Sequence, residues 1–163
     1  MKDPFPFQPI PWLSEWSRPF ANRLGLYVLP LHIHEIVYSA ALYFVIYYAI
    51  SPAFSHLFAS KYYSHLSRKK ILNWDAHVVA MIQALLISGV ALWVLFTDEE
   101  RMNMDRDGRM WGYTGGCGLI AALAVGYFVW DLVVTSLNLD VFGIGTLVHA
   151  IAALTAFSLG FVS

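Results

Sequence analysis

The chain has 163 residues, of which 58% are hydrophobic and 13% charged, and its formal net charge is −1. Soluble domains average about 45–50% apolar and about 25% charged residues, so this composition excludes an ordinary soluble enzyme and a disordered chain. The weak net charge offers no basic surface to a polyanion, which excludes a nucleic-acid partner. The single cysteine, Cys117, excludes an internal disulfide framework, and its place in an apolar run predicts a buried, inert thiol.

Residues 1–30 are predicted to be an N-terminal interfacial segment. They hold six prolines and no long apolar core, so they do not form a secretory signal peptide. Because proline fixes φ and removes a backbone donor, we expect extended or turning backbone here. Aromatic side chains alternate with polar ones, which favours a position along the membrane surface, where tryptophan is enriched. A loosely ordered tail is the alternative.

Four apolar runs follow, at residues 31–54, 74–96, 112–135 and 141–162. Each is near the ~20 residues that cross a hydrocarbon layer of ~30 Å. Lipid offers no partner to open backbone groups, so each run is predicted to be a helix. The predicted fold is an all-α, polytopic transmembrane bundle of about four spanning helices. Pro52 is expected at the far end of the first, and residues 136–140 form a tight hairpin between the last two.

Asp131 lies well inside the third run and is a candidate catalytic residue. A charge within the bilayer is costly, so such a residue by default indicates a buried polar site. Tyr127 and Thr135 are four residues away on either side and share its helix face. We therefore expect Asp131 to be buried in the bundle, either in a structural hydrogen-bond network or as a functional acid.

His149 lies inside the fourth run and is the second candidate catalytic residue. Gly145 and Ala153 are its neighbours one turn away, so another helix can come close to the imidazole. The short hairpin places the third and fourth helices together, and Asp131 can then approach His149. A carboxylate that orients a histidine is a common acid/base arrangement. A hydrogen bond from His149 to another helix is the structural alternative.

Other ionisable residues have structural interpretations. Glu35 and His77 lie near helix starts, where an interfacial position satisfies them. Asp75 is expected in the first turn of its helix, where a carboxylate interacts with exposed amides and the dipole. His32 and His34 are two residues apart, on different helix faces and without a carboxylate cluster, so no metal site is expected. No nucleotide or cofactor motif occurs either.

Small residues recur at four-residue spacing in the last two runs, as in close-packed membrane helices. They are Gly112 and Gly116, then Gly118, Ala122 and Gly126, and in the fourth run Ala152, Ala156 and Gly160.

Six stretches stand in a characteristic order: residues 1–14, 29–35 (Leu-Pro-Leu-His-Ile-His-Glu), 73–79 (Asn-Trp-Asp-Ala-His-Val-Val), 111–116, 126–131 and 142–150. In that order they resemble the TLC-domain membrane proteins, the superfamily of the ceramide synthases, and a fungal branch most closely. The resemblance implies a role in membrane lipid composition or homeostasis, with membrane lipids as partners, in the endoplasmic reticulum. It makes residues 31–163 a partial TLC-type domain, because family members usually continue to about six or more spans. The chain thus resembles a C-terminally truncated form.

Ceramide synthases carry an adjacent histidine pair in the span that aligns with residues 141–162. Here His149 matches the first member and Ala150 stands at the second position. We therefore do not expect robust catalysis from this chain. The alternatives are an acyl-CoA-dependent acyltransferase with His149 as base and Asp131 as its orienter, and a transporter that uses Asp131. We also expect the open face of the last helix to mediate homo- or hetero-association.

Overall fold

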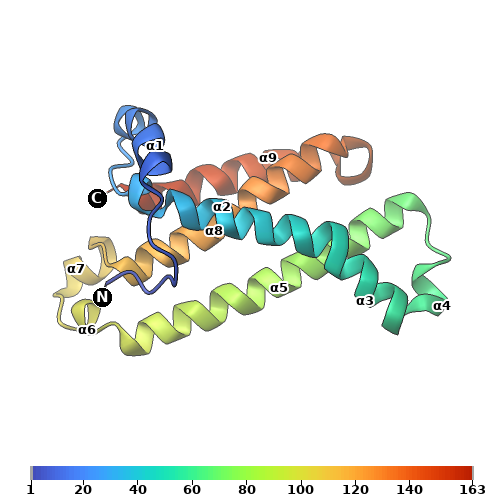
Figure 1. The fold of residues 1–163 in the computed structure, drawn as a ribbon, viewed down its shortest axis with the longest axis horizontal. Helices are drawn as coiled ribbons and strands as arrows, with labels where there is room; N and C mark the ends of the chain where they lie inside the picture. Colours follow the sequence, from blue (N-terminus) through green and yellow to red (C-terminus); the bar gives the residue numbers. More distant parts are fainter. Residues whose placement is uncertain (1, 163) are drawn as a thin grey trace.

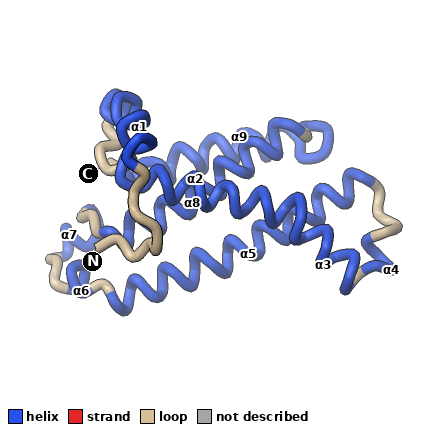
Figure 2. Tube along the Cα trace, viewed as in Figure 1, coloured by secondary structure: helices blue, strands red, loops and turns tan. Residues whose placement is uncertain are grey.

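The computed structural model describes residues 2–162, which form a helical bundle without a β-strand in that range (Figures 1 and 2). The N-terminal segment, the two short helices α6 and α7 and the C-terminus lie at one end of the long axis. Helices α3 and α4 lie at the other end. The helices are α1 (Pro11–Leu24), α2 (Leu29–Val45), a π-helix (Ile46–Ile50), α3 (Ser51–Phe58), α4 (Ser60–Tyr63), α5 (Arg68–Thr97), α6 (Glu99–Met102), α7 (Arg106–Trp111), α8 (Gly115–Leu137), α9 (Leu139–Ser158) and a 3₁₀ turn (Leu159–Phe161).

Four helical segments are long and apolar enough to cross a membrane, which confirms the predicted all-α polytopic class. They are Leu29–Phe58, Arg68–Thr97, Arg106–Leu137 and Leu139–Phe161. The second is longer than predicted, because the helix continues through the basic residues that precede the apolar run. Such side chains do not stop a helix, since the long lysine and arginine stems lose little freedom in it.

The first span does not end at Pro52. It continues to Phe58 through the π-helix Ile46–Ile50, in which the backbone N–H of Ser51 donates to the carbonyl of Ile46. A proline removes a donor and crowds the turn before it. The wider turn directly before Pro52 accommodates the ring, so the apolar run stays helical.

Residues 11–24 are helical, which corrects the expected extended backbone, whereas residues 2–10 are irregular. Pro11 occupies the start of α1, where a backbone N–H would have no partner and the fixed φ suits a helix. Pro19 is tolerated inside the helix. Gly25 ends α1 with φ at 72°, a left-handed conformation that glycine adopts without strain.

Helix α1 is amphipathic, and its exposed face is aromatic. Trp12, Trp16 and Phe20 follow at four-residue spacing and are all exposed, while the buried side of the helix packs on α2. Four-residue spacing places the three rings on one side of the helix. This pattern suits a helix lying in the headgroup region, which remains a prediction.

Helices α2 and α8 form the centre of the bundle, and glycines let them approach. A Cβ on Gly126 would lie 1.8 Å from Oγ of Ser39, and one on Gly118 would lie 2.3 Å from Nε2 of His32. The small-residue stripe of α8 therefore packs against α2, as its spacing predicted. Apolar residues of α1, α2, α8 and the C-terminal turn complete this core around Ile36 and Ala122.

Helices α8 and α9 form the predicted hairpin, with Asn138 alone between them. Gly143 interrupts the helical backbone of α9 with φ at 79°, inside the span Leu139–Phe161. Helix α9 packs on α8, but Ala152 and Ala156 of its own small-residue stripe are exposed. Gly160, the third member, does approach α8, because a Cβ there would lie 3.1 Å from Cβ of Ala121. The predicted association through this face stays a prediction.

Asp98 directly follows α5 and joins the start of α6 to the start of α8. Its fully buried carboxylate accepts hydrogen bonds from Oγ1 of Thr114 (2.6 Å) and from the backbone N–H of Arg101 (3.3 Å). Thr114 in turn caps α8 by accepting from the N–H of Cys117. Burial alone would raise the pKa of Asp98, but the hydrogen bonds hold it below its ordinary value.

We expect Asp98→Asn to lower the free energy of unfolding by about 1.5–3 kcal/mol, because it replaces a hydrogen-bonded carboxylate. The pKa of Asp98 is lower in the folded state, so the carboxylate stabilises the fold above its unfolded pKa of about 3.9 and loses this effect as the pH falls through the folded value. Thermal unfolding in detergent at several pH values checks this. A difference between wild type and variant that stays constant into strong acid would contradict it.

Candidate functional site

The candidate site forms where residues 2–9 pass over the start of α2 and of α8. Asp3 is brought to the two α2 residues His32 and Glu35, which are one helical turn apart. Both are buried, with side chains 1% and 0% exposed. Gly115 at the start of α8 makes this path available, because a Cβ there would lie 2.3 Å from the backbone nitrogen of Asp3.

His32 is held on both ring nitrogens. Its Nδ1 lies 2.7 Å from Oε1 of Glu35 and 3.6 Å from Oδ2 of Asp3. Its Nε2 forms a hydrogen bond with the hydroxyl of Tyr113. The ring of Phe161 stacks on the imidazole, with ring centroids 5.9 Å apart. Packing and hydrogen bonds therefore fix the imidazole in one orientation.

Two buried polar atoms in this region have no hydrogen-bond partner among residues 2–162. They are Oε2 of Glu35 and Nδ1 of His34. His34 is fully buried, and its Nε2 donates to the carbonyl of Phe7 at 3.1 Å. Buried polar groups are nearly always satisfied, and Oε1 of Glu35 is bonded to His32, so Oε2 is the carboxylate oxygen of this cluster that lacks a partner.

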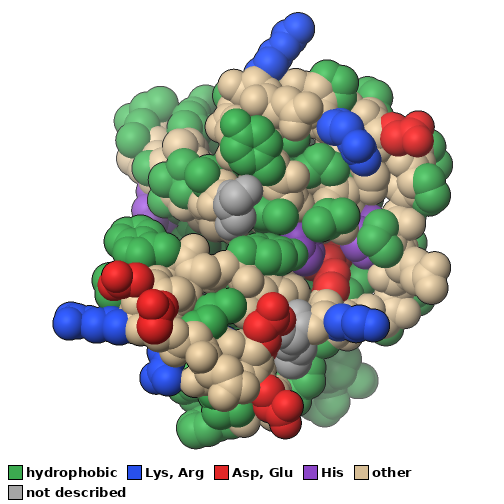
Figure 3. All heavy atoms as spheres, turned by 90° about the vertical axis from the view of Figure 1, so that its left-hand side faces the viewer, with side chains coloured by type: hydrophobic (Ala, Val, Ile, Leu, Met, Phe, Trp, Pro, Cys, Tyr) green, Lys and Arg blue, Asp and Glu red, His purple; other side chains and the backbone are tan. Residues whose placement is uncertain are grey.

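A cleft of about 480 Å³ opens over the cluster. Its wall is largely apolar and includes Phe5, Phe7 and Leu31. His32 and Tyr113 contribute polar groups, and the charged lining residues are Lys2, Asp3 and Glu100. Figure 3 looks at this end of the bundle, where histidine and acidic side chains lie close together near the middle, between hydrophobic side chains. The buried cluster is thus reached from the end of the bundle.

The sequence analysis missed this cluster. Glu35 is buried rather than interfacial, and His32 does have carboxylates beside it, which corrects both expectations. The three-residue spacing from His32 to Glu35 was the available signal, because it places the two side chains on one helix face. Nothing in the local pattern indicates that Asp3 joins them.

Asp131 is half-buried, where burial in the bundle was predicted. Oγ1 of Thr135 donates to its carboxylate at 3.4 Å, as the four-residue spacing suggested. The carboxylate lines a small pocket of about 210 Å³, together with Tyr127 and His77. His77 itself is exposed at the protein surface, and its Nδ1 lies 2.7 Å from the carbonyl of Asn73. The pocket between α5, α8 and α9 stays open, which explains the partial burial.

His149 is exposed on α9, and its ring lies beside Phe128, with centroids 6.3 Å apart. Within residues 2–162, neither a hydrogen bond nor an ion pair joins it to Asp131. The hairpin brings the two helices together but turns the imidazole outward. A catalytic role for Asp131 and His149 stays a prediction.

Asp75 belongs to a separate buried network at the opposite end of the bundle. It lies in the second turn of α5 rather than the first, so it does not cap the helix. Its carboxylate accepts from Oγ of Ser51 at 2.6 Å and from the hydroxyl of Tyr63 at 2.8 Å. The interaction with helix amides that we expected is therefore replaced by bonds to two other helices.

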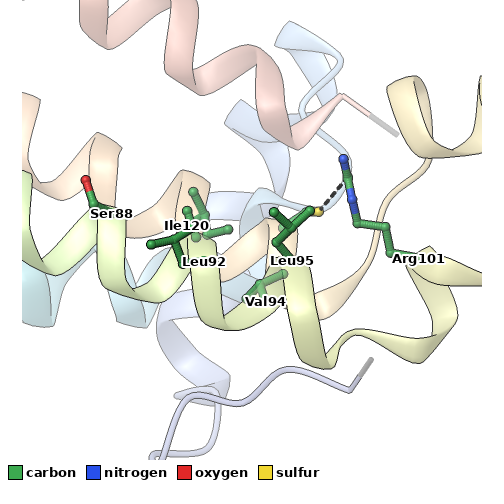
Figure 4. A pocket seen from close by; sticks show the side chains of 8 residues that line it. Ser88, Leu92, Val94, Leu95, Arg101 and Ile120 are labelled. Carbon is green, nitrogen blue, oxygen red and sulfur yellow. Dashed lines mark hydrogen bonds between the residues drawn. The ribbon is translucent and has the colours of Figure 1, made fainter.

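An apolar groove of about 570 Å³ separates part of α5 from α8 (Figure 4). Leu92 and Ile120 line it, and Arg101 donates to Sγ of Cys117 at 3.5 Å at one end. Cys117 is therefore half-buried beside a cation, whereas the sequence predicted a buried thiol.

Comparison with known proteins adds a family match. The TLC domain model matches residues 73–163. An uncharacterised TLC domain-containing protein of Schizosaccharomyces pombe is 43% identical over 143 residues, which cover 87% of this chain and 47% of that protein. Topoisomerase I damage affected protein 4 of Saccharomyces cerevisiae is 26% identical, and the match covers 75% of this chain and 42% of that protein. TLC domain-containing protein 4 C of Dictyostelium discoideum is also 26% identical, and the match covers 77% of this chain and 46% of that protein. The chain spans about half the length of these relatives. No solved structure matches it significantly.

Proposed function

The chain belongs to the TLC-domain family of membrane proteins, and from this premise we propose that it binds membrane phospholipid and acts in membrane lipid composition or homeostasis. The amphipathic cleft at the end of the bundle is the observation that carries the proposal. Phospholipids combine a charged headgroup with apolar chains, and the cleft offers surfaces for both. The proposed compartment is the endoplasmic reticulum, as the likeness to ceramide synthases implies.

The contacts of the cleft suit a lipid that lies along the outside of the bundle. Leu31 is half-exposed on α2, a spanning helix, and forms part of the cleft wall. At the polar side Lys2 can pair with a headgroup phosphate, while Asp3 and Glu100 in the same lining favour a headgroup that also carries a cation, as phosphatidylcholine does. An acyl chain beside Leu31 therefore continues into the bilayer, while the headgroup stays at the level of the interface.

The test compares two leucines with similar exposure. Leu31 (52% exposed) lines the cleft, while Leu24 (56% exposed) ends α1 outside it. We expect Leu31→Asp to weaken phospholipid binding about tenfold, because a lost apolar contact of about 1.5 kcal/mol corresponds to that factor. Leu24→Asp should leave it unchanged. Binding is measured by native mass spectrometry of the chain titrated with phosphatidylcholine. Equal binding by both variants would show that the cleft is not the phospholipid site.

Cell experiments separate the lipid role from its alternatives. Deletion of the gene should change the phospholipid profile, and a tagged chain should co-localise with an endoplasmic-reticulum marker. Acyl-CoA-dependent formation of a new lipid that His149→Ala abolishes would instead establish an acyltransferase. Solute uptake into proteoliposomes that Asp131→Asn abolishes would establish a transporter.

A further inference from the structure

We propose that Asp3, His32 and Glu35 form a binding site for one divalent transition-metal ion, with Zn²⁺ as the best match. The carboxylate oxygens and Nδ1 of His32 all lie within 4.8 Å of one another. One imidazole nitrogen with two carboxylate oxygens is a donor set that zinc accepts, and three protein ligands with an open fourth position are typical of its non-structural sites. The proposal is independent of the phospholipid proposal.

The distances already approach those of a metal site. Two ligands of a tetrahedral zinc ion, each about 2.0–2.1 Å from it, are about 3.3 Å apart. Nδ1 of His32 lies 3.6 Å from Oδ2 of Asp3, close to that value. Its 2.7 Å hydrogen bond with Oε1 of Glu35 must open by roughly half an ångström to admit an ion, and an ion bound by both oxygens of Glu35 also satisfies Oε2. Small side-chain movements therefore suffice.

The unpartnered oxygen of Glu35 independently points to a ligand. Glu35 is completely buried, and its Oε2 has no hydrogen-bond partner among the described residues. A second carboxylate, that of Asp3, lies in the same cluster. A buried carboxylate oxygen without a partner costs free energy even when the other oxygen is bonded, as Oε1 is to His32, and two carboxylates together repel each other. One divalent cation satisfies the free oxygen and neutralises both charges.

The surroundings provide what a metal-binding histidine needs. Such a histidine almost always uses its second ring nitrogen in a hydrogen bond that fixes the ring, and Nε2 of His32 pairs with the Tyr113 hydroxyl. The stacked ring of Phe161 supports the same orientation. The cleft lined by Asp3 and His32 provides the entry path and leaves room for a fourth ligand.

The 163-residue chain, purified in detergent and freed of metal with a chelator, tests the proposal by titration with Zn²⁺ against a fluorescent zinc chelator. We expect one ion per chain, and binding about 10–100-fold weaker for Asp3→Asn and Glu35→Gln. Tyr113→Phe should weaken it about tenfold, as outer ligands do. Asp3→Asn is the decisive variant, because this residue lies on the N-terminal segment with its side chain 30% exposed, so its replacement leaves the core intact.

Matched controls remove other possible ligands. His77→Gln and Asp131→Asn replace a histidine and an aspartate outside the cluster, and both should bind as wild type does. X-ray absorption of the zinc-loaded chain should show nitrogen and oxygen ligands only. Absence of binding, unchanged affinity in Asp3→Asn, or a sulfur ligand, which would indicate Cys117, would each overturn the proposal.

Discussion

Gly126→Leu is expected to disrupt the centre of the bundle and to lower the free energy of unfolding by about 3 kcal/mol or more. A Cβ at this position would lie 1.8 Å from Oγ of Ser39 and 2.9 Å from the carbonyl oxygen of Ile36, so α2 and α8 must move apart. Overpacking of a close contact typically costs about 1–3 kcal/mol, and here the backbone itself is in the way. Thermal unfolding of the detergent-purified chain measures the loss.

Gly89 is the matched control, because a Cβ at this α5 position would meet nothing within 4 Å. Gly89→Leu should keep or slightly raise the stability, since leucine favours a helix over glycine by about 0.8 kcal/mol. A second comparison isolates the contact with Ser39. Gly126→Ala should destabilise wild type more than it destabilises Ser39→Gly, in which the clashing side chain is gone. Equal effects of leucine at Gly126 and Gly89 would show that the two helices are not in close contact.

The spans could be predicted from the sequence because the bilayer restricts the chain so strongly. A run such as residues 112–135 has no stable alternative to a helix in lipid, and its glycine spacing indicates the packed face. Helix ends were less predictable. Pro52 is tolerated only because a π-turn precedes it, and α1 is helical because Pro11 lies at the position where proline helps rather than harms. Whether a proline is tolerated in a helix depends on the conformation of the turns next to it, which cannot be predicted from composition.

The candidate site could be predicted only in part, because it joins residues far apart in the chain. His32 and Glu35 share a helix face by spacing alone, but Asp3 reaches them through an irregular segment whose path depends on Gly115. The candidates Asp131 and His149 illustrate the converse. Their hairpin was predictable, whereas the rotation of α9, which exposes His149, depends on packing and on the break at Gly143. Helix rotation is set by side-chain contacts on all sides.

At the opposite end of the bundle, Asp75→Leu is expected to lower the free energy of unfolding nearly as much as Gly126→Leu does. The buried carboxylate joins three helices, because Ser51 belongs to α3, Tyr63 to α4 and Asp75 to α5. Burial, together with the hydrogen bond and charge of Asp75, raises the pKa of Tyr63 above its ordinary value, so the phenol stays a donor at physiological pH. The Asp75→Leu variant leaves both hydroxyls without their acceptor.

Hydrogen bonds to a charged group contribute about 1.5–3 kcal/mol each, and so the loss on Asp75→Leu should be about 3 kcal/mol or more, with Asp75→Asn in between. Asp140→Leu is the control, because that aspartate is 57% exposed and its contact with Lys69 at 3.5 Å is a surface ion pair worth about 0–1 kcal/mol. Combining Asp75→Leu with Tyr63→Phe should cost less than the sum of the single changes, since both remove the same bond. Thermal unfolding of the five variants decides between the outcomes. Additive losses, or equal losses at Asp75 and Asp140, would mean that the buried carboxylate does not hold α3, α4 and α5 together.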